Sequence, residues 1–213
     1  MKLKTILSTI LLGVTIISGC SSNKSQTSPY LNNSLCTPKI QFNYKIDKNT
    51  PINKKTEYIL KKLETTPDII QKEANKRGIE IIITNKNTKD IKELKQYYKK
   101  MYLSPPSYTD GVFLSNKYII INQNSKYLFS GQLTTHEIGH LNAYLLYINN
   151  KTEENAILTN LLLDKNYKKI STRKQAEKFA IEYSNYKNNQ FTKYTPFIIK
   201  KESELIKILQ EKK

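Results

Sequence analysis

The segment that most constrains the fold of this chain is residues 132–148, which contains both of its histidines. Apolar residues recur there at helical spacing, which predicts a long α-helix with an apolar face (Leu133, Ile138, Leu141, Leu145 and Ile148). Side chains four residues apart lie on one face of a helix, so His136 and His140 should point the same way. Any fold of this chain therefore has to place two imidazoles side by side on one helix.

The two histidines belong to the sequence His136-Glu137-Ile138-Gly139-His140. Imidazole nitrogens are preferred zinc ligands. Glu137 lies about 100° around the helix from His136, where it can act on a water beside the metal without binding the metal itself. This is the H-E-x-x-H arrangement of zinc peptidases, in which the glutamate is the general base. With two histidines in 213 residues, the pattern would arise by chance on the order of once in a thousand. We therefore predict a catalytic Zn²⁺ site.

The third protein ligand that a catalytic zinc usually has cannot be a histidine, because the chain has no other. A metzincin would carry histidine at position 146, where this chain has Leu146. A carboxylate on a later helix is the remaining choice, and four glutamates are candidates: Glu153, Glu154, Glu177 and Glu182. The first two follow the motif so closely that they suit the first turn of a new helix. Glu177 lies beside the apolar positions of its predicted helix, but the residues alone do not decide among the candidates.

The first twenty residues have the pattern of an export signal. Two lysines precede an uncharged, mostly apolar run of about 15 residues, which is short for a membrane-spanning helix of about 20. The run ends in Ile17-Ser18-Gly19-Cys20, which resembles a bacterial lipobox and implies cleavage before Cys20 and lipid attachment to its sulfur. We expect residues 1–19 to be a lipoprotein signal peptide and the protein to be lipid-anchored in the cell membrane, facing the extracytoplasmic side.

The rest of the chain is expected to be a tether and one folded domain. Residues 20–50 are rich in Ser, Asn, Thr and Pro and lack an apolar period, which predicts a flexible tether. Cys36 would be the one remaining thiol, so an apolar core and not a disulfide framework has to hold the fold. Residues 51–213 are long enough for one domain with such a core, and we expect it to be a monomer.

The predicted elements place strands early in the chain and only helices late. A helix start at Thr66-Pro67, with Thr66 as N-cap, and a stop at Gly78 bound one of the early helices. Residues 79–84 form a β-branched strand, and residues 111–122 form a hairpin. Helices are predicted at 54–63, 66–77, 90–101, 132–148, 152–163, 172–187 and 196–210. The fold class is therefore α+β, with a small N-terminal sheet and helices followed by an all-helical C-terminal half.

Two local features suggest how the motif helix is packed and how a substrate could be held. Gly139 is expected to let the helix approach a neighbouring strand closely. The hairpin at 111–122 should offer an exposed edge, to which an extended peptide can add as a further strand. The sequence does not tell which of its two strands is the free one.

The formal net charge of +17 raises the question of an anionic partner. The lysines are spread from end to end and form no single block, so the charge is a property of the composition. It predicts weak attraction to anionic lipid or wall polymers. We expect no nucleic-acid partner, because the chain carries an export signal.

The motif and its surroundings resemble the catalytic domain of anthrax lethal factor and its relatives, the pro-pro endopeptidases. The specific residues are "HEIGH" at 136–140 and "AEKFA" at 176–180. Three other segments agree at the level of pattern: "IIQKEANKRGIEIIIT", "GVFLSNKYIII" and "TPFIIKKESELIKIL". The resemblance spans residues 54–209. It implies a zincin-like fold of the gluzincin type, with the active site between the sheet and the helical half and with Glu177 as the third zinc ligand.

Two positions depart from the pattern of this family. The family usually has a second acid four residues after the ligand glutamate, where this chain has Ile181. It also has a tyrosine seven residues before that glutamate, where this chain has Ile170. Tyr167 is the nearest tyrosine, and we expect it to supply the hydroxyl that stabilises the oxyanion.

The expected function is that of a membrane-tethered zinc endopeptidase. Zinc held by His136, His140 and Glu177 would activate water with Glu137 as general base, and the substrates would be extracellular or cell-surface proteins. The alternative is a lipoprotein binding module that keeps the zincin fold without turnover. Glu137 favours the peptidase, whereas the missing acid at Ile181 keeps the alternative open.

Overall fold

In the computed structural model of the chain, the described residues are 40–87, 90–100, 110–114, 117–128, 132–159 and 172–212. All of them belong to one compact unit, Thr37–Lys213. The predicted signal peptide, Cys20, residues 20–39 of the predicted tether and Tyr167 lie outside the described residues.

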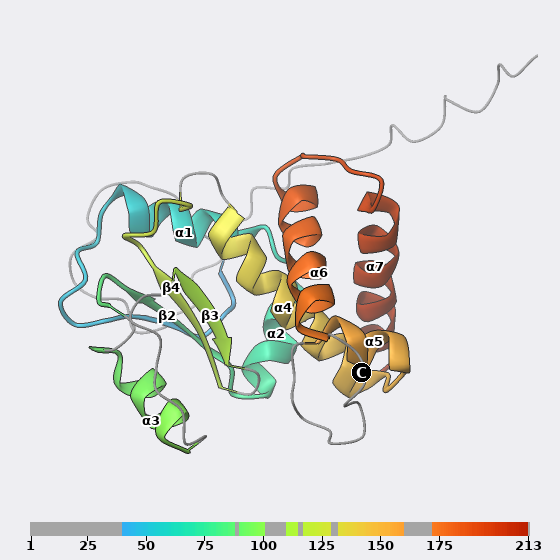
Figure 1. The fold of residues 1–213 in the computed structure, drawn as a ribbon, viewed down its shortest axis with the longest axis horizontal. Coiled ribbons are helices and arrows are strands. Elements are labelled where there is room, and N and C mark those ends of the chain that lie inside the picture. Colours follow the sequence, from blue (N-terminus) through green and yellow to red (C-terminus); the bar gives the residue numbers. More distant parts are fainter. Residues whose placement is uncertain are drawn as a thin grey trace, which may run out of the picture. The chain divides into compact units, whose positions relative to one another are not determined.

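Strands occur only in the first half of the described chain, and the second half is helical (Figure 1). The first half consists of β1 (Tyr44–Ile46), α1 (Lys54–Glu64), α2 (Asp68–Lys76), β2 (Glu80–Thr84), α3 (Lys92–Lys100), β3 (Gly111–Leu114) and β4 (Tyr118–Asn122). The second half consists of α4 (Gln132–Asn149), α5 (Glu153–Leu158), α6 (Thr172–Lys187) and α7 (Thr195–Glu211). This order confirms the predicted α+β class.

The four strands form one mixed sheet in the order β1-β2-β4-β3. β1, β2 and β4 are parallel, with Ile83 of β2 opposite Ile46 and Ile121. β3 and β4 form the predicted antiparallel hairpin, in which Gly111 is opposite Ile121. The sheet order therefore answers the question that the sequence left open: β3 is the edge strand of the hairpin.

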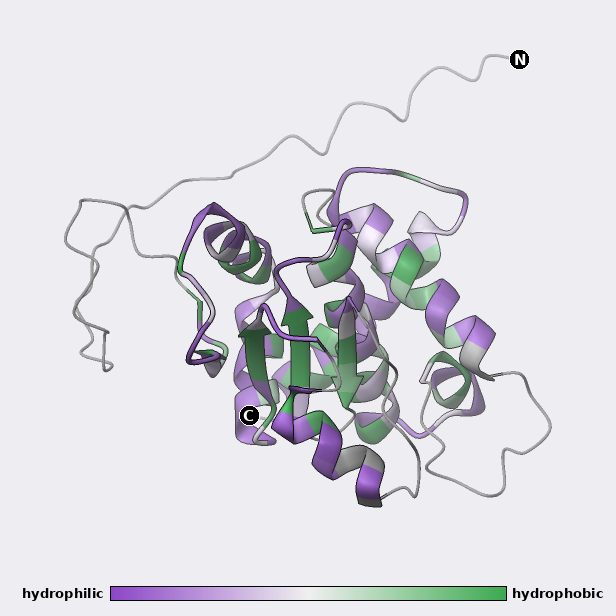
Figure 2. Cartoon of the chain, turned by 60° about the vertical axis from the view of Figure 1, so that its left-hand side comes forward, coloured by the Kyte–Doolittle hydropathy of each residue, from purple (hydrophilic) through white to green (hydrophobic). Residues whose placement is uncertain are grey.

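Both faces of the sheet are covered, which explains why its central strands are continuous runs of isoleucine. Ile81 and Ile83 belong to the main core, together with residues of α1, α2, α4, α6 and α7. Ile82 points to the other face, where it packs with Ile91, the residue before α3, and with Leu94 of α3. Figure 2 shows the strands as apolar segments between helices with hydrophilic outer faces.

Three predicted boundaries are wrong. The helix predicted at 152–163 ends at Leu158, because the backbone of Thr159 is extended. The tether was expected to extend to residue 50, but Tyr44–Ile46 form a strand that pairs with β2. Three residues are too short for an apolar alternation to be recognised in the sequence. Helix α2 begins at Asp68, one residue after Pro67, and no side chain caps it. Thr66 instead accepts a hydrogen bond at its carbonyl from the Gln71 side chain, at 2.7 Å.

Helix α4 is the central element of the fold. It contacts β3, β4, α1, α5, α6 and α7, and it lies between the sheet and α6 in Figure 1. Most of its residues are buried, because other elements surround it. Side chains of α4 can therefore reach both the sheet edge and the helical half.

None of the helices within the described residues is long and apolar enough to cross a membrane.

Candidate metal centre

Helix α4 holds both histidines in fixed positions because the flanking residues on the same helix are buried. Ile138 and Leu141 are in the main core, with 1% and 0% of their surface exposed. The side chains of His136 and His140 are 21% and 11% exposed, so both are mostly buried but can still be reached from the site. Their Nε2 atoms are 3.2 Å apart. The predicted juxtaposition of the two imidazoles on one helix face is thus present.

Helix α6 packs against α4 through a glycine. A Cβ on Gly139 would lie 2.8 Å from the Cα of Ala180, so only glycine allows the two backbones to come this close. The expectation that Gly139 approaches a strand is therefore wrong, since its neighbour is a helix. This contact matters for the site because Glu177 lies on α6 within one turn of Ala180.

A cluster of hydrogen bonds also joins α4 and α6, about one helical turn away from the contact between Gly139 and Ala180. The hydroxyl oxygens of Thr135 and Ser184 are 2.7 Å apart, and the Ser184 hydroxyl donates to the Gln132 carbonyl at 3.0 Å. The Asn188 side chain donates to the Thr135 hydroxyl at 3.0 Å, and Lys62 of α1 donates to Asn188 at 2.7 Å. The cluster lies next to His136 in the sequence, so it sets the position of α6 relative to the histidines.

Glu177 completes a group of three side chains that is able to hold a metal ion. Their ligand atoms all lie within 4.8 Å of one another. The Nε2 atom of His136 is 3.3 Å from Glu177 Oε2, and the Nε2 atom of His140 is 3.8 Å from Glu177 Oε1. One carboxylate from α6 therefore faces two imidazoles from α4.

The separations of these atoms fit a zinc ion. Tetrahedral ligands about 2.0–2.2 Å from one ion are about 3.3–3.5 Å apart, and two nitrogens with one carboxylate oxygen are a donor set that zinc takes in catalytic sites. The two imidazole nitrogens are 3.2 Å apart, and they lie 3.3 and 3.8 Å from different oxygens of the Glu177 carboxylate, so the carboxylate has to turn to bring one oxygen to the metal position. Small rotations of the three side chains are enough to place all three ligand atoms around one ion.

The pKa values of the two histidines are shifted in opposite directions. Burial, helped by the positive charge of His136, lowers the pKa of His140 to about 4, against the influence of Glu177. Burial also acts to lower the pKa of His136, but its hydrogen bond with Glu177 and the negative charges of Glu137 and Glu177 outweigh it, so that pKa is raised. At neutral pH His140 is therefore uncharged, which is the state in which imidazole binds a metal.

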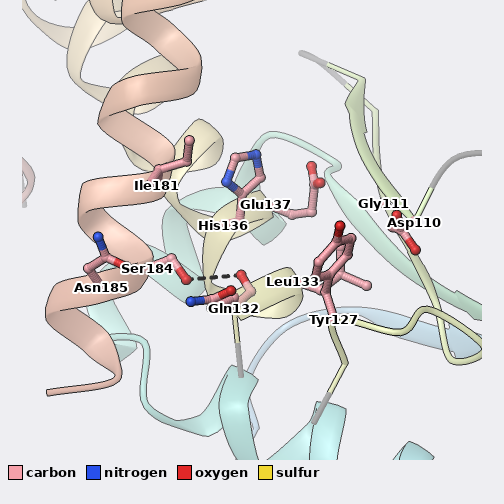
Figure 3. Close-up of a pocket in the computed structure, with 10 residues that line it drawn as sticks. All are labelled: Asp110, Gly111, Tyr127, Gln132, Leu133, His136, Glu137, Ile181, Ser184 and Asn185. Atoms are coloured by element: carbon pink, nitrogen blue, oxygen red, sulfur yellow. Dashed lines mark hydrogen bonds between the residues drawn. The ribbon is translucent and has the colours of Figure 1, made fainter. Parts of the chain in front are cut away.

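Glu137 is buried on the side of α4 that faces the sheet. Only 4% of its surface is exposed, and burial raises its pKa to about 7, opposed by His136 and aided by Glu177. A carboxyl group with a pKa near neutrality can both accept and return a proton. Figure 3 shows its side chain extending from α4 towards Gly111, away from the α6 side of His136.

Gly111, the first residue of β3, makes room for the Glu137 carboxylate. A Cβ at this position would lie 2.7 Å from Glu137 Oε1 and 2.9 Å from Leu133 Cδ1. These contacts are too short to persist, so a larger residue has to displace the carboxylate. Gly111 is the first residue of the predicted hairpin, and nothing near it in the sequence indicates the helix that it meets.

We expect Gly111→Ala to reduce turnover without removing the metal. The substitution moves the flexible end of Glu137, and a displacement of this kind near the reacting atoms costs at least about tenfold in rate. Gly111 does not have a positive φ, so alanine fits its backbone and the free energy of unfolding should change by less than about 1 kcal/mol.

The measurements for Gly111→Ala are zinc content, thermal unfolding and peptide turnover. Unchanged zinc content with reduced turnover is the expected result. Full turnover in a variant that binds zinc normally would show that the carboxylate position is not set by Gly111.

The other predicted candidates for the third ligand lie elsewhere. Glu154 pairs with the buried amine of Lys201 at 2.6 Å, and Glu153 is exposed in the first turn of α5. Glu182 accepts a hydrogen bond from the Thr192 hydroxyl at 2.6 Å. Within the described residues, Glu177 is thus the acid that joins the two histidines.

The departures from the family pattern have different outcomes. Ile181, which stands where the family has an acid, is 50% exposed and lines the cavity beside His136. It therefore offers an apolar surface at a place where a charge was expected. Tyr167 lies outside the described residues, so its role stays a prediction.

No known protein-family model and no curated protein sequence matches this chain. The function of the chain therefore has to be inferred from the residues of the site.

Proposed function

We propose that this chain is a zinc endopeptidase of the gluzincin type with a zincin-like fold, similar to the catalytic domain of anthrax lethal factor. The observation that carries the proposal is the arrangement of His136, His140 and Glu177, whose ligand atoms lie within 4.8 Å of one another and are able to hold a metal ion. Glu137 adds a second carboxyl group beside this site, and it is not one of the three metal ligands. Two histidines, a ligand acid and a buried general base are what water-dependent peptide hydrolysis requires.

The mechanism assigns separate work to the two acids. Zinc, when bound, supplies a Lewis acid that polarises a peptide carbonyl and makes a nearby water more acidic. Glu177 holds the metal against the two imidazoles. Glu137 takes the proton of the attacking water and then passes it to the nitrogen of the leaving amine. Tyr167 is proposed as the donor that stabilises the negative charge on the carbonyl oxygen.

The edge strand β3 is the proposed docking site for the substrate backbone. β3 is paired on one side with β4 and begins beside Glu137. An extended peptide that pairs with its other side would gain main-chain hydrogen bonds and pass along the metal site. Protein or peptide segments without a compact fold are therefore the proposed substrates.

A binding module without turnover is the alternative, and the state of Glu137 favours the peptidase. Burying a carboxylate to 4% exposure without making it a metal ligand costs folding free energy. A role in proton transfer would explain why the protein keeps a carboxyl group at this position.

The proposal is tested by exposing a peptide library to the protein with zinc, with a chelator, and with zinc restored after chelation. We expect cleavage in the first and third samples only. An absence of cleavage of any peptide by the zinc-loaded protein would support the binding module instead.

The location of the enzyme is also a proposal. The lipobox-like residues before Cys20 support a lipid anchor in the cell membrane, which would keep the catalytic unit on the extracytoplasmic surface. We expect Cys20→Ala to abolish lipid attachment and membrane association while turnover by the released domain persists. Mass spectrometry and detergent phase separation check this. A wild-type protein that partitions into the aqueous phase without lipid would contradict it.

A further inference from the structure

A cavity of about 620 Å³ begins at His136 and Glu137 and extends to the first turn of α4. Figure 3 shows residues of α6 on one side of it, residues near β3 on the other, and side chains of α4 between them. The lining residues are Asp110, Gly111, Tyr127, Gln132, Leu133, His136, Glu137, Ile181, Ser184 and Asn185. The cavity therefore lies on one side of the metal site, next to the start of β3.

The direction of β3 tells which part of a bound peptide reaches this cavity. Gly111 lies beside Leu133 and Glu137 in the first half of α4. The ring of Phe113 packs 5.7 Å from that of Tyr144 in the second half of α4. β3 thus runs from the cavity towards the C-terminal end of α4.

A peptide that pairs antiparallel with β3 runs the opposite way. Antiparallel pairing is slightly more stable per residue than parallel pairing, and β3 already pairs in this manner with β4. The residues of the peptide that follow the cut bond then lie at the Gly111 end, where the cavity opens. The cavity receives the side chain on the carboxyl side of the cut, beside the leaving amine.

The lining selects a chemical class of side chain. Among its described residues, the lining contains the two carboxyl groups of Glu137 and Asp110 and no lysine or arginine. Glu137 is next to the metal ligands, whereas Asp110 is at the β3 end of the cavity. Tyr127, which is 46% exposed, provides apolar surface on the β3 side of the cavity, and Ile181, which is 50% exposed, provides it on the α6 side.

We propose that this cavity is the specificity pocket for a basic residue, lysine or arginine, directly after the cut bond. The alkyl stem of such a residue would lie against Tyr127, and its cationic end would pair with Asp110 on the same side of the cavity. This inference rests on the proposed function, and it names the substrate class of the same site.

Lys126 is a cation of the protein that can compete for Asp110. Its amine is fully exposed and lies 4.8 Å from the ring centre of Tyr127, and its pKa is raised mainly by a hydrogen bond with Tyr127 and to a smaller extent by the negative charge of Asp110. A solvated amine on a flexible stem holds a carboxylate only weakly. Removing Lys126 should therefore strengthen the pocket for a basic residue, and removing Asp110 should weaken it.

The test uses peptides that are identical except for lysine, norleucine or glutamate after the cut bond. For the zinc-loaded wild type, we expect kcat/KM to favour lysine over glutamate by at least about fivefold. Asp110→Asn should bring this ratio close to one, and Lys126→Met should increase it. Asp90→Asn, which changes an exposed acid outside the cavity, is the matched control and should leave the ratio as in wild type.

Three outcomes would overturn the inference. The first is equal cleavage of the lysine and glutamate peptides by the wild type, and the second is a ratio that does not change in Asp110→Asn. The third is a preference for lysine before the cut bond, which would mean that the peptide runs parallel to β3.

The affinities for the same peptides are measured as well, so that a failure of the pocket and a failure of the proposed function can be told apart. Fluorescence anisotropy with the chelator-treated wild-type protein, which keeps both carboxyl groups of the pocket, measures the affinity for each peptide without turnover. A lysine preference in binding, without cleavage by the wild type, would reject the peptidase and keep the pocket. Equal affinities for the lysine and glutamate peptides would reject the pocket, whether or not the wild type cuts them.

Discussion

Glu137→Ala should retain zinc and lose at least about 10²-fold in peptide turnover, because general-base catalysis contributes about 10²–10⁴. Glu137 is adjacent to a ligand in the sequence, but its carboxylate extends towards Gly111 and the substrate edge. It is not among the three side chains whose atoms converge on the metal position. Its loss therefore removes a proton acceptor and leaves the metal ligands in place.

Zinc stoichiometry and kcat/KM of the same preparation of Glu137→Ala are the two measurements. Loss of zinc together with activity would mean that the carboxylate supports the metal. Turnover within a few fold of wild type, with zinc bound, would remove Glu137 from the mechanism.

Glu177→Ala should lower the affinity for zinc by at least about 100-fold, because it removes one of three protein ligands and changes to outer partners of a ligand already cost 10–100-fold. The carboxylate of Glu177 faces both histidines at 3.3 and 3.8 Å. Turnover should fall with zinc occupancy, and excess zinc should restore part of it. Competition with a chromophoric chelator measures the affinity.

The matched control is Glu182→Ala, an acid on the same helix. Its carboxylate accepts a hydrogen bond from Thr192 at 2.6 Å and is not part of the metal group. Its removal should leave zinc affinity near that of wild type. The opposite pattern, with zinc lost in Glu182→Ala and kept in Glu177→Ala, would place the third ligand at Glu182.

Much of the fold could be predicted because its signals are local. Apolar periodicity alone locates α1, α4, α6 and α7 to within about two residues, and the β-branched runs locate β2 and the hairpin. β1 was missed because its three residues become a strand only by pairing with β2. Propensity does not record such a pairing in advance.

The candidate site shows the same division between local and long-range information. His136 and His140 are fixed by helix geometry, so the sequence is sufficient for them. The position of Glu177 depends on how α6 crosses α4, which is set by the contact of Gly139 with Ala180 and by the Thr135–Ser184 hydrogen bond.

Neither of these interhelical contacts has a signature in one sequence. Gly139 looks like a weak helix residue, and Thr135 and Ser184 look like ordinary polar positions. The approach of Gly111 to Glu137 is similarly invisible, because it joins a strand end and a helix that meet only in the folded protein. The residues and the family resemblance thus point to His136, His140 and Glu177, and the tertiary packing brings these three side chains together.

The central claim is that His136, His140 and Glu177 hold one zinc ion, and metal analysis tests it most directly. The protein to use is the compact unit Thr37–Lys213, reconstituted with zinc and dialysed, with His140→Ala prepared in parallel. We expect about one zinc per wild-type chain and a clear loss of zinc in the variant. Wild-type protein that stays metal-free after reconstitution, or a variant that keeps its zinc, would contradict the account.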